Sequence, residues 1–91
     1  SNVHSLRRGA AEAIELIAHG DARTSKVIGK RLDEIELPQG VTVGAILRGA
    51  EVVIAHSHIT VEPDDHVILF LTDQNRIAEV ERLFAPGFGF F

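Results

Sequence analysis

The chain has 91 residues, 13 acidic and nine basic side chains, a formal net charge of -4 and no cysteine. This length suits one domain, and the acidic balance with scattered basic residues argues against nucleic acid as a partner. The lack of thiols excludes a disulfide framework and a cysteine metal site, and no apolar run approaches the roughly 20 residues that span a bilayer. We therefore expect a soluble domain without direct membrane insertion.

The first segment, residues 1–11, is interpreted as a linker or a tag remnant, and the chain as an excised piece of something larger. Residues 13–18 (AIELIA) follow as the first expected strand. A helix over residues 10–17 is nearly as good on propensity, because Ala and Glu favour helices. The strand is the preferred interpretation, with residues 12–84 forming the domain.

A helix is predicted over residues 24–36. Thr24 or Ser25 can accept the free N–H groups of its first turn. The apolar residues Ile28, Leu32 and Ile35 then fall at i, i+4 and i+7 on one face. The helix should end before Pro38, because a residue that precedes proline is disfavoured in the helical region.

Three strands are expected between residues 41 and 72, the last over residues 66–71 (HVILFL), which lies centrally because it is apolar on both faces. A type II′ turn at Gly49 and Ala50 sets Arg48 opposite Glu51. Asp73 then caps a closing helix over residues 74–84. The predicted fold class is α+β, in the order β-α-β-β-β-α, with a mostly antiparallel sheet packed by two helices.

Both faces of the predicted hairpin are largely apolar. Because side chains alternate along a strand, one face carries Val43, Ala45, Leu47, Val52 and Ile54, and the other carries Gly44, Ile46, Arg48, Glu51, Val53 and Ala55. A sheet with one face in water alternates apolar with polar residues. We therefore expect a second copy of the chain, or the rest of a longer parent protein, to cover the second face.

The C-terminal tail, residues 85–91, contains three of the five Phe residues, separated by glycines. Each Phe buries a large area when it finds a partner. Two interpretations stay open: the tail folds back onto its own domain, or it docks on another subunit.

No catalytic constellation is present, and the chain is not expected to be an enzyme. It has no Cys, and its serines lack the strand-turn-helix setting of an activated nucleophile. His56 and His58 would face one side of a strand near the acidic residues 62–65, which leaves a metal-dependent enzyme as a remote alternative. Ordinary turn chemistry explains the acidic tract better, so we expect no physiological metal.

Arg48 has two readings. It can form a cross-strand ion pair with Glu51, worth about 0.2 to 1 kcal/mol. Alternatively, it points into a dimer crevice and binds an anionic ligand with its planar fork of donors. No Gly-rich phosphate motif lies between a strand and a helix.

The order and spacing of these features resemble the C-terminal RCK (TrkA-C) domain family over nearly all of residues 12–84. The matching features are the strand EAIELIA, the segment leading into IELPQG, the hairpin VGAILRGAEVVIA, the turn at Asp64 and Asp65, and HVILFLTD followed by a helix.

The resemblance implies a cytoplasmic regulatory domain, peripheral to the inner face of the membrane and attached to a potassium transporter's membrane subunit. It implies a homodimer, and NAD or ATP would belong to an N-terminal Rossmann-like domain that this fragment lacks, so no cofactor is expected here. A small anionic nucleotide effector would sit between two copies, at Ile46, Arg48, Val53, Ala55 and His56. The alternative parent is another cation channel or a cation/proton antiporter.

Overall fold

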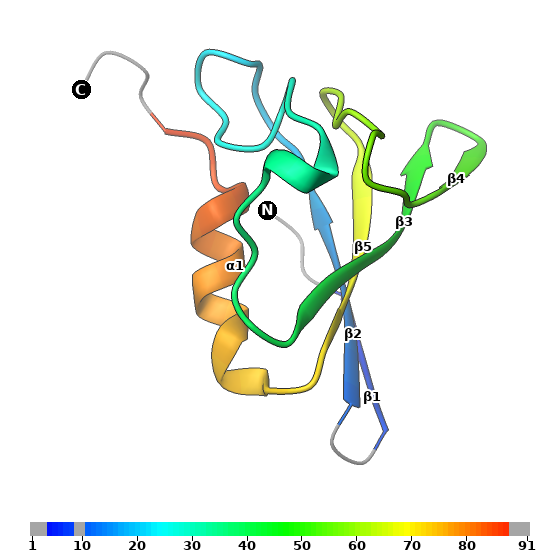
Figure 1. Ribbon diagram of the computed structural model, residues 1–91, viewed down its shortest axis with the longest axis vertical. Coiled ribbons are helices and arrows are strands. Elements are labelled where there is room, and N and C mark those ends of the chain that lie inside the picture. Colours follow the sequence, from blue (N-terminus) through cyan, green and yellow to red (C-terminus); the bar gives the residue numbers. More distant parts are fainter. Residues whose placement is uncertain (1–3, 9–10, 88–91) are drawn as a thin grey trace.

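The computed structural model describes residues 4–8 and 11–87, and it has an α+β fold (Figure 1). One antiparallel sheet of five strands is packed on one side by a single α-helix and by long connecting loops. The elements, in chain order, are β1 (His4–Arg8), β2 (Ala11–Ile17), η1 (Leu32–Glu34), β3 (Val41–Arg48), β4 (Glu51–Ile54), β5 (His66–Leu71), η2 (Gln74–Arg76) and α1 (Ile77–Phe84), where η marks a short 3-10 helix.

The strand order is β1-β2-β5-β3-β4, and every neighbouring pair is antiparallel. β5 therefore lies in the middle of the sheet, as its apolar sequence predicted. In the β3–β4 hairpin Arg48 is opposite Glu51, which confirms the predicted register. Gly49 has a φ of 60° while Ala50 has no positive φ, as a type II′ turn requires.

The core lies between the sheet and α1. The side chains of β2, β5 and β3 that face it alternate with residues on the other side of the sheet, and Val80 and Phe84 of α1 cover them. Asp73 caps this end of the chain by accepting a hydrogen bond from the Asn75 N–H at 2.9 Å, which confirms the predicted cap. The buried apolar residues are Ile14, Leu16, Ala18, Val27, Ile28, Val41, Ile46, Val61, Val67, Leu69, Leu71, Val80 and Phe84.

A β-bulge at Gly44 changes the predicted faces of β3. Val43 pairs with Leu69 and Ala45 with Ile68, so Gly44 is an extra residue in the ladder. Val43 therefore lies on the core side with Ile46, and its predicted place beside Ala45 and Leu47 was wrong. A Cβ on Gly44 would collide with the ring of Phe70, which explains why the bulged position carries glycine.

The other side of the sheet is uncovered by any described element. It carries mostly apolar side chains from four strands, with Thr42, Glu15 and His66 as the polar exceptions. We call this surface the open face: Ala13, Glu15, Ile17, Thr42, Ala45, Leu47, Val52, Ile54, His66, Ile68 and Phe70. Val52, Ile54 and Phe70 are 61%, 71% and 52% exposed, so the expectation of a second apolar face is confirmed.

The helix predicted over residues 24–36 does not form, and only the 3-10 turn η1 is helical there. Ser25 does cap a turn, because its Oγ accepts hydrogen bonds from the N–H groups of Val27 and Ile28 at 3.0 Å. Gly29, at a φ of 85°, then turns the chain out of the helical conformation. The backbone beyond it pairs with residues 57–61, through bonds such as Gly29 N–H to the Val61 carbonyl at 2.8 Å.

The segment assigned to a linker, residues 1–11, contains β1 and the start of β2. β1 pairs with β2 from His4 opposite Glu15 to Arg8 opposite Ala11. Its sequence, HSLRR, offers a single apolar residue, so it carries no strand signal of its own; edge strands tolerate such charge. Of the tail, Gly87 donates to the Thr24 carbonyl at 2.6 Å, while the three Phe residues fall outside the described part of the chain.

Candidate functional site

Arg48, at the end of β3, makes a bidentate ion pair with Asp65. Its Nε lies 2.9 Å from Oδ1 and its Nη2 lies 2.8 Å from Oδ2 of a carboxylate that is 1% exposed. The same guanidinium donates to the Thr60 carbonyl at 3.0 Å and pairs with Glu62 Oε2 at 3.0 Å. Three of its five N–H groups thus donate hydrogen bonds, and Nη1 adds the ion pair with Glu62.

These contacts give Arg48 an ion partner other than the predicted Glu51. The hydrogen bond to Asp65, together with the charges of Asp65 and Glu62, raises the pKa of Arg48, against the lowering effect of its burial. Glu51 is its neighbour across the hairpin, yet its charge contributes least among the causes of this pKa shift. The cross-strand pair with Glu51 is therefore replaced by a pair with the turn before β5, and Arg48 holds the hairpin to that turn.

The five residues predicted to bind an effector do not share one surface. Ile46 is fully buried in the core, and Val53, opposite it on β4, packs against the same cluster. Arg48 is engaged as described. Only Ala55 and His56 reach a hollow on the surface.

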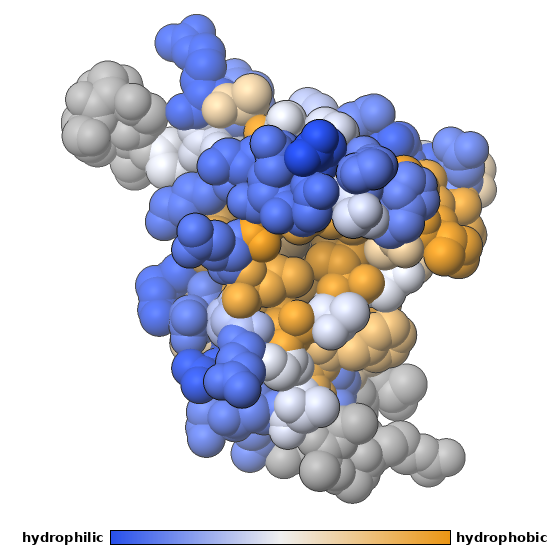
Figure 2. Space-filling view, viewed as in Figure 1, coloured by the Kyte–Doolittle hydropathy of each residue, from blue (hydrophilic) through white to orange (hydrophobic). Residues whose placement is uncertain are grey.

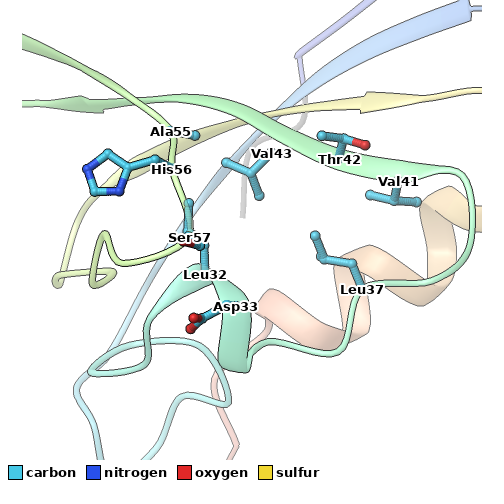
Figure 3. Close-up of a pocket in the computed structure, with 9 residues that line it drawn as sticks. All are labelled: Leu32, Asp33, Leu37, Val41, Thr42, Val43, Ala55, His56 and Ser57. Carbon is cyan, nitrogen blue, oxygen red and sulfur yellow. The ribbon is translucent and has the colours of Figure 1, made fainter.

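That hollow is a pocket of about 260 Å³ between β3 and the segment around η1 (Figure 3). Val43 and Leu37 point toward each other across its opening, and the imidazole of His56 is turned away from it. In Figure 2 apolar residues gather in the middle of this face, hydrophilic residues lie above and to the left of them, and a second apolar group lies at the right-hand edge. Its walls are mostly apolar: Leu32, Asp33, Leu37, Val41, Thr42, Val43, Ala55, His56 and Ser57.

The walls of this pocket that come from residues 32–43 were not predicted from the sequence. The predicted helix over residues 24–36 would have placed Leu32 on its packed face and Leu37 in the turn that ends it, away from any pocket. The available signal was Gly29, since a glycine inside a helical pattern weakens the prediction of a helix. Because these residues form a loop around η1 and not a helix, they are separated from β3, and the pocket lies between the two segments.

His56 and His58 do not form a metal centre with the acidic turn. Their rings meet edge to face at a centroid distance of 6.4 Å, and Nδ1 of His56 accepts a hydrogen bond from the His58 N–H at 3.3 Å. Asp65, from the same acidic tract, is committed to Arg48. In residues 4–8 and 11–87 no group of three or more His, Asp or Glu side chains is arranged to hold a metal.

Comparison with known proteins matches this chain to the TrkA-C domain model over residues 22–85. It is 62% identical to "Trk system potassium uptake protein TrkA" of Halomonas elongata over 99% of this chain and 20% of that protein. The proteins of the same name from Vibrio alginolyticus and Haemophilus influenzae are 58% and 44% identical over 94% of this chain and 19% of their own length. The chain thus spans about a fifth of these relatives. Within the described part of the chain, no helix is long and apolar enough to cross a membrane.

Proposed function

The chain belongs to the TrkA-C domain family, and we propose that it is the dimerising regulatory domain of a potassium-uptake subunit. Its relatives bear the name of a Trk system potassium uptake protein, and the chain corresponds to about a fifth of them. The proposal includes a cytoplasmic location at the inner face of the membrane and a membrane transporter subunit as partner of the whole protein. Control of potassium transport, without a catalytic step, is its role.

The open face carries this proposal. Fully burying a Val, Ile or Phe side chain is worth about 1.5 to 3 kcal/mol relative to leaving it exposed. Val52, Ile54 and Phe70 lie half or more in water, and they belong to one continuous apolar surface. Exposed apolar patches of this kind mark interaction sites in soluble proteins. A second copy placing the same face against it covers both surfaces at once.

A small anionic nucleotide effector is the proposed ligand of the dimer, held near the β3–β4 hairpin. Of the five predicted residues, Arg48 carries the positive charge that an anion needs, and its side chain is 28% exposed. Arg48 can turn toward an anion only by giving up Glu62, the exposed partner in its network. The effector regulates by population shift, since it changes the arrangement of two copies only by binding one arrangement better than another.

Light scattering over a dilution series tests the dimer. We expect the wild-type chain to have twice the monomer mass, and Ile54→Asp to have the monomer mass, because the substitution puts a carboxylate into the apolar surface that the proposed dimer buries. Ile54 is 71% exposed in one copy, so its replacement leaves the fold intact, as a thermal melt will check. The matched control is Gln39→Asp, which adds the same charge at an exposed loop position.

A wild-type chain that stays monomeric at millimolar concentration would overturn the proposed homodimer. If the dimer forms, the same measurement with added nucleotides tests the effector. A nucleotide that changes neither the dissociation constant of the dimer nor its melting temperature is excluded as the effector.

A further inference from the structure

The outer edge of β3 beside the pocket has no strand partner among the described residues. β3 runs from Val41 to Arg48, but β4 is short and pairs with it only from Ala45 onward. The last contact on that side is the Ala55 N–H, which donates to the Gly44 carbonyl at 3.3 Å. Residues 41–43 therefore border the pocket instead of a neighbouring strand.

Along β3 the backbone N–H and C=O groups of successive residues point alternately toward β5 and toward the space beside residues 41–43. The Thr72 N–H donates to the Gly40 carbonyl at 3.1 Å, so Gly40 faces β5. In an antiparallel pair successive residues point their N–H and C=O groups to opposite sides. The backbone N–H and C=O groups of Val41 and Val43 consequently point away from β5. The Val41 N–H already donates to the Pro38 carbonyl at 3.2 Å. The backbone groups of Val43 point toward the pocket.

The wall of the pocket opposite β3 is formed by the loop that contains Leu32, Asp33 and Leu37, and hydrogen bonds hold this loop in place. The Leu32 and Asp33 N–H groups donate to the carbonyls of Ile59 and Ser57 at 2.9 and 3.1 Å, which ties the loop to the segment after β4. The slot between loop and strand contains the side chains of Val43 and Leu37 (Figure 3). Its volume of about 260 Å³ holds one large apolar side chain and adjoining backbone.

The charge around the slot favours a basic occupant. Asp33 lines it and Glu34 is exposed next to it in the chain, whereas Glu36 lines a second hollow with Lys26 and Arg82. Arg31 offsets part of this charge through its ion pair with Asp33 at 3.0 Å. The lining residues include no Lys or Arg, so a phosphate group would find no fixed cation there.

We propose that this edge of β3 binds an extended peptide segment of a partner protein, with one apolar side chain in the pocket and basic residues on both sides of it. The segment adds a short strand beside Val43, and main-chain hydrogen bonds supply affinity while the pocket selects the side chain. The site lies at the edge of the sheet and goes beyond the proposed function, because it does not require the dimer.

The probe is an acetylated and amidated pentapeptide, Lys-Thr-Leu-Thr-Lys, titrated into the ¹⁵N-labelled 91-residue chain. We expect saturable shifts of the amide signals of residues 41–44 and 32–37. Two N-methylated peptides, one modified at the central Leu and one at both Thr residues, separate backbone pairing from side-chain burial. One of them should bind at least about fivefold more weakly than the unmodified peptide, and the affinity of the other should stay within about twofold. The reason is that only every second residue of the peptide directs its N–H toward β3.

Three results would overturn the proposal. Equal affinity of both methylated peptides excludes strand addition, and equal affinity of a peptide with Ser in place of Leu excludes the pocket. Shifts centred on Val52, Ile54 and Phe70 would instead place the peptide on the open face. Asp in place of both Lys residues should weaken binding, and equal affinity would remove the basic preference.

Matched variants complete the test. Ala55→Leu fills the pocket from its rim and should weaken peptide binding at least about fivefold, whereas Ile54→Asp, the adjacent position on the open face, should not. The result with Ile54→Asp also separates this site from the dimer, since that variant removes the proposed dimer and leaves the slot. Because the peptide series uses the wild-type chain, a folding defect in Ala55→Leu does not affect the conclusion.

Discussion

Arg48 and Asp65 lie 17 residues apart in sequence and form a two-pronged ion pair with N–O distances of 2.9 and 2.8 Å. Asp65 is almost completely buried, and its Oδ2 also accepts a hydrogen bond from the Glu62 N–H at 2.8 Å. One carboxylate thus closes the turn before β5 and binds the end of β3. The pair connects the exposed hairpin to the centre of the sheet.

Replacing Arg48 with Ala should lower the free energy of unfolding by about 3 kcal/mol, because it leaves the buried Asp65 carboxylate without its charge partner. Urea denaturation measures the change. Arg31→Ala is the matched control: its pair with Asp33 is exposed on both sides and should cost less than about 1 kcal/mol. Equal losses in the two variants would contradict the structural role assigned to Arg48.

Asp21 gives the loop after β2 a pH dependence on the acid side. Hydrogen bonds from the backbone N–H groups of Arg23 and Thr24 to its carboxylate lower the pKa of Asp21. Since the folded pKa is below the unfolded one, the stabilisation is present at neutral pH and is lost as the pH falls below about 4.

Asp21→Asn tests this, because the amide oxygen keeps an acceptor but does not titrate. We expect wild-type stability to fall more steeply than that of the variant as the pH is lowered from about 5 to 2. The other carboxylates cancel in the comparison. A carbon-13 titration of the Asp21 carboxyl should have its midpoint below the ordinary aspartate value, and a midpoint at or above that value would refute the assignment.

The parts of the fold that the sequence predicted correctly depend on contacts between nearby residues. The β3–β4 register follows from one glycine at the turn, and the cap of the C-terminal helical segment from Asp73. The central position of β5 follows from its apolar composition. In each case the local pattern and the tertiary environment favour the same structure.

The errors occurred where distant segments decide the structure. Residues 24–36 have helical spacing, but their backbone is paired with residues 57–61 and turned at Gly29. β1 forms a strand because its backbone pairs with β2. The bulge at Gly44 inserts an extra residue, so Val43 lies on the opposite side of the sheet from the one that simple alternation predicts. The ion partner of Arg48 was missed for the same reason, since Glu51 is near in sequence while Asp65 is brought close only by the fold.

Zinc should leave the melting temperature of the chain unchanged. Zn²⁺ in proteins takes four ligands, or three with a water, and any ion that binds the folded state tightly raises its stability. His56 and His58 are two ligands at most, and Nδ1 of His56 already accepts the His58 N–H. A melt with one equivalent of zinc checks this. A rise in melting temperature that disappears in the double variant His56→Ala/His58→Ala would contradict this prediction.

Gly44 and Phe70 should be energetically coupled through the bulge. A Cβ at position 44 would collide with Cε2 of the Phe70 ring, so Gly44→Ala forces the ring to move and should cost about 1 to 3 kcal/mol. In a Phe70→Ala background the obstacle is absent. Because Gly44 has no positive φ, alanine then fits the backbone and the cost should fall below about 0.5 kcal/mol.

Urea denaturation of the four proteins in this double-mutant cycle gives the coupling energy, which should be at least about 1 kcal/mol. Gly49→Ala is the control in both backgrounds. Apart from its two chain neighbours, no heavy atom of the described residues lies within 4 Å of a Cβ at that position, but its φ of +60° strains alanine. Its cost therefore comes from the backbone and should be the same with or without the Phe70 ring. If Gly44→Ala is equally costly in both backgrounds, the glycine is required by the bulge itself and not by the ring that covers it.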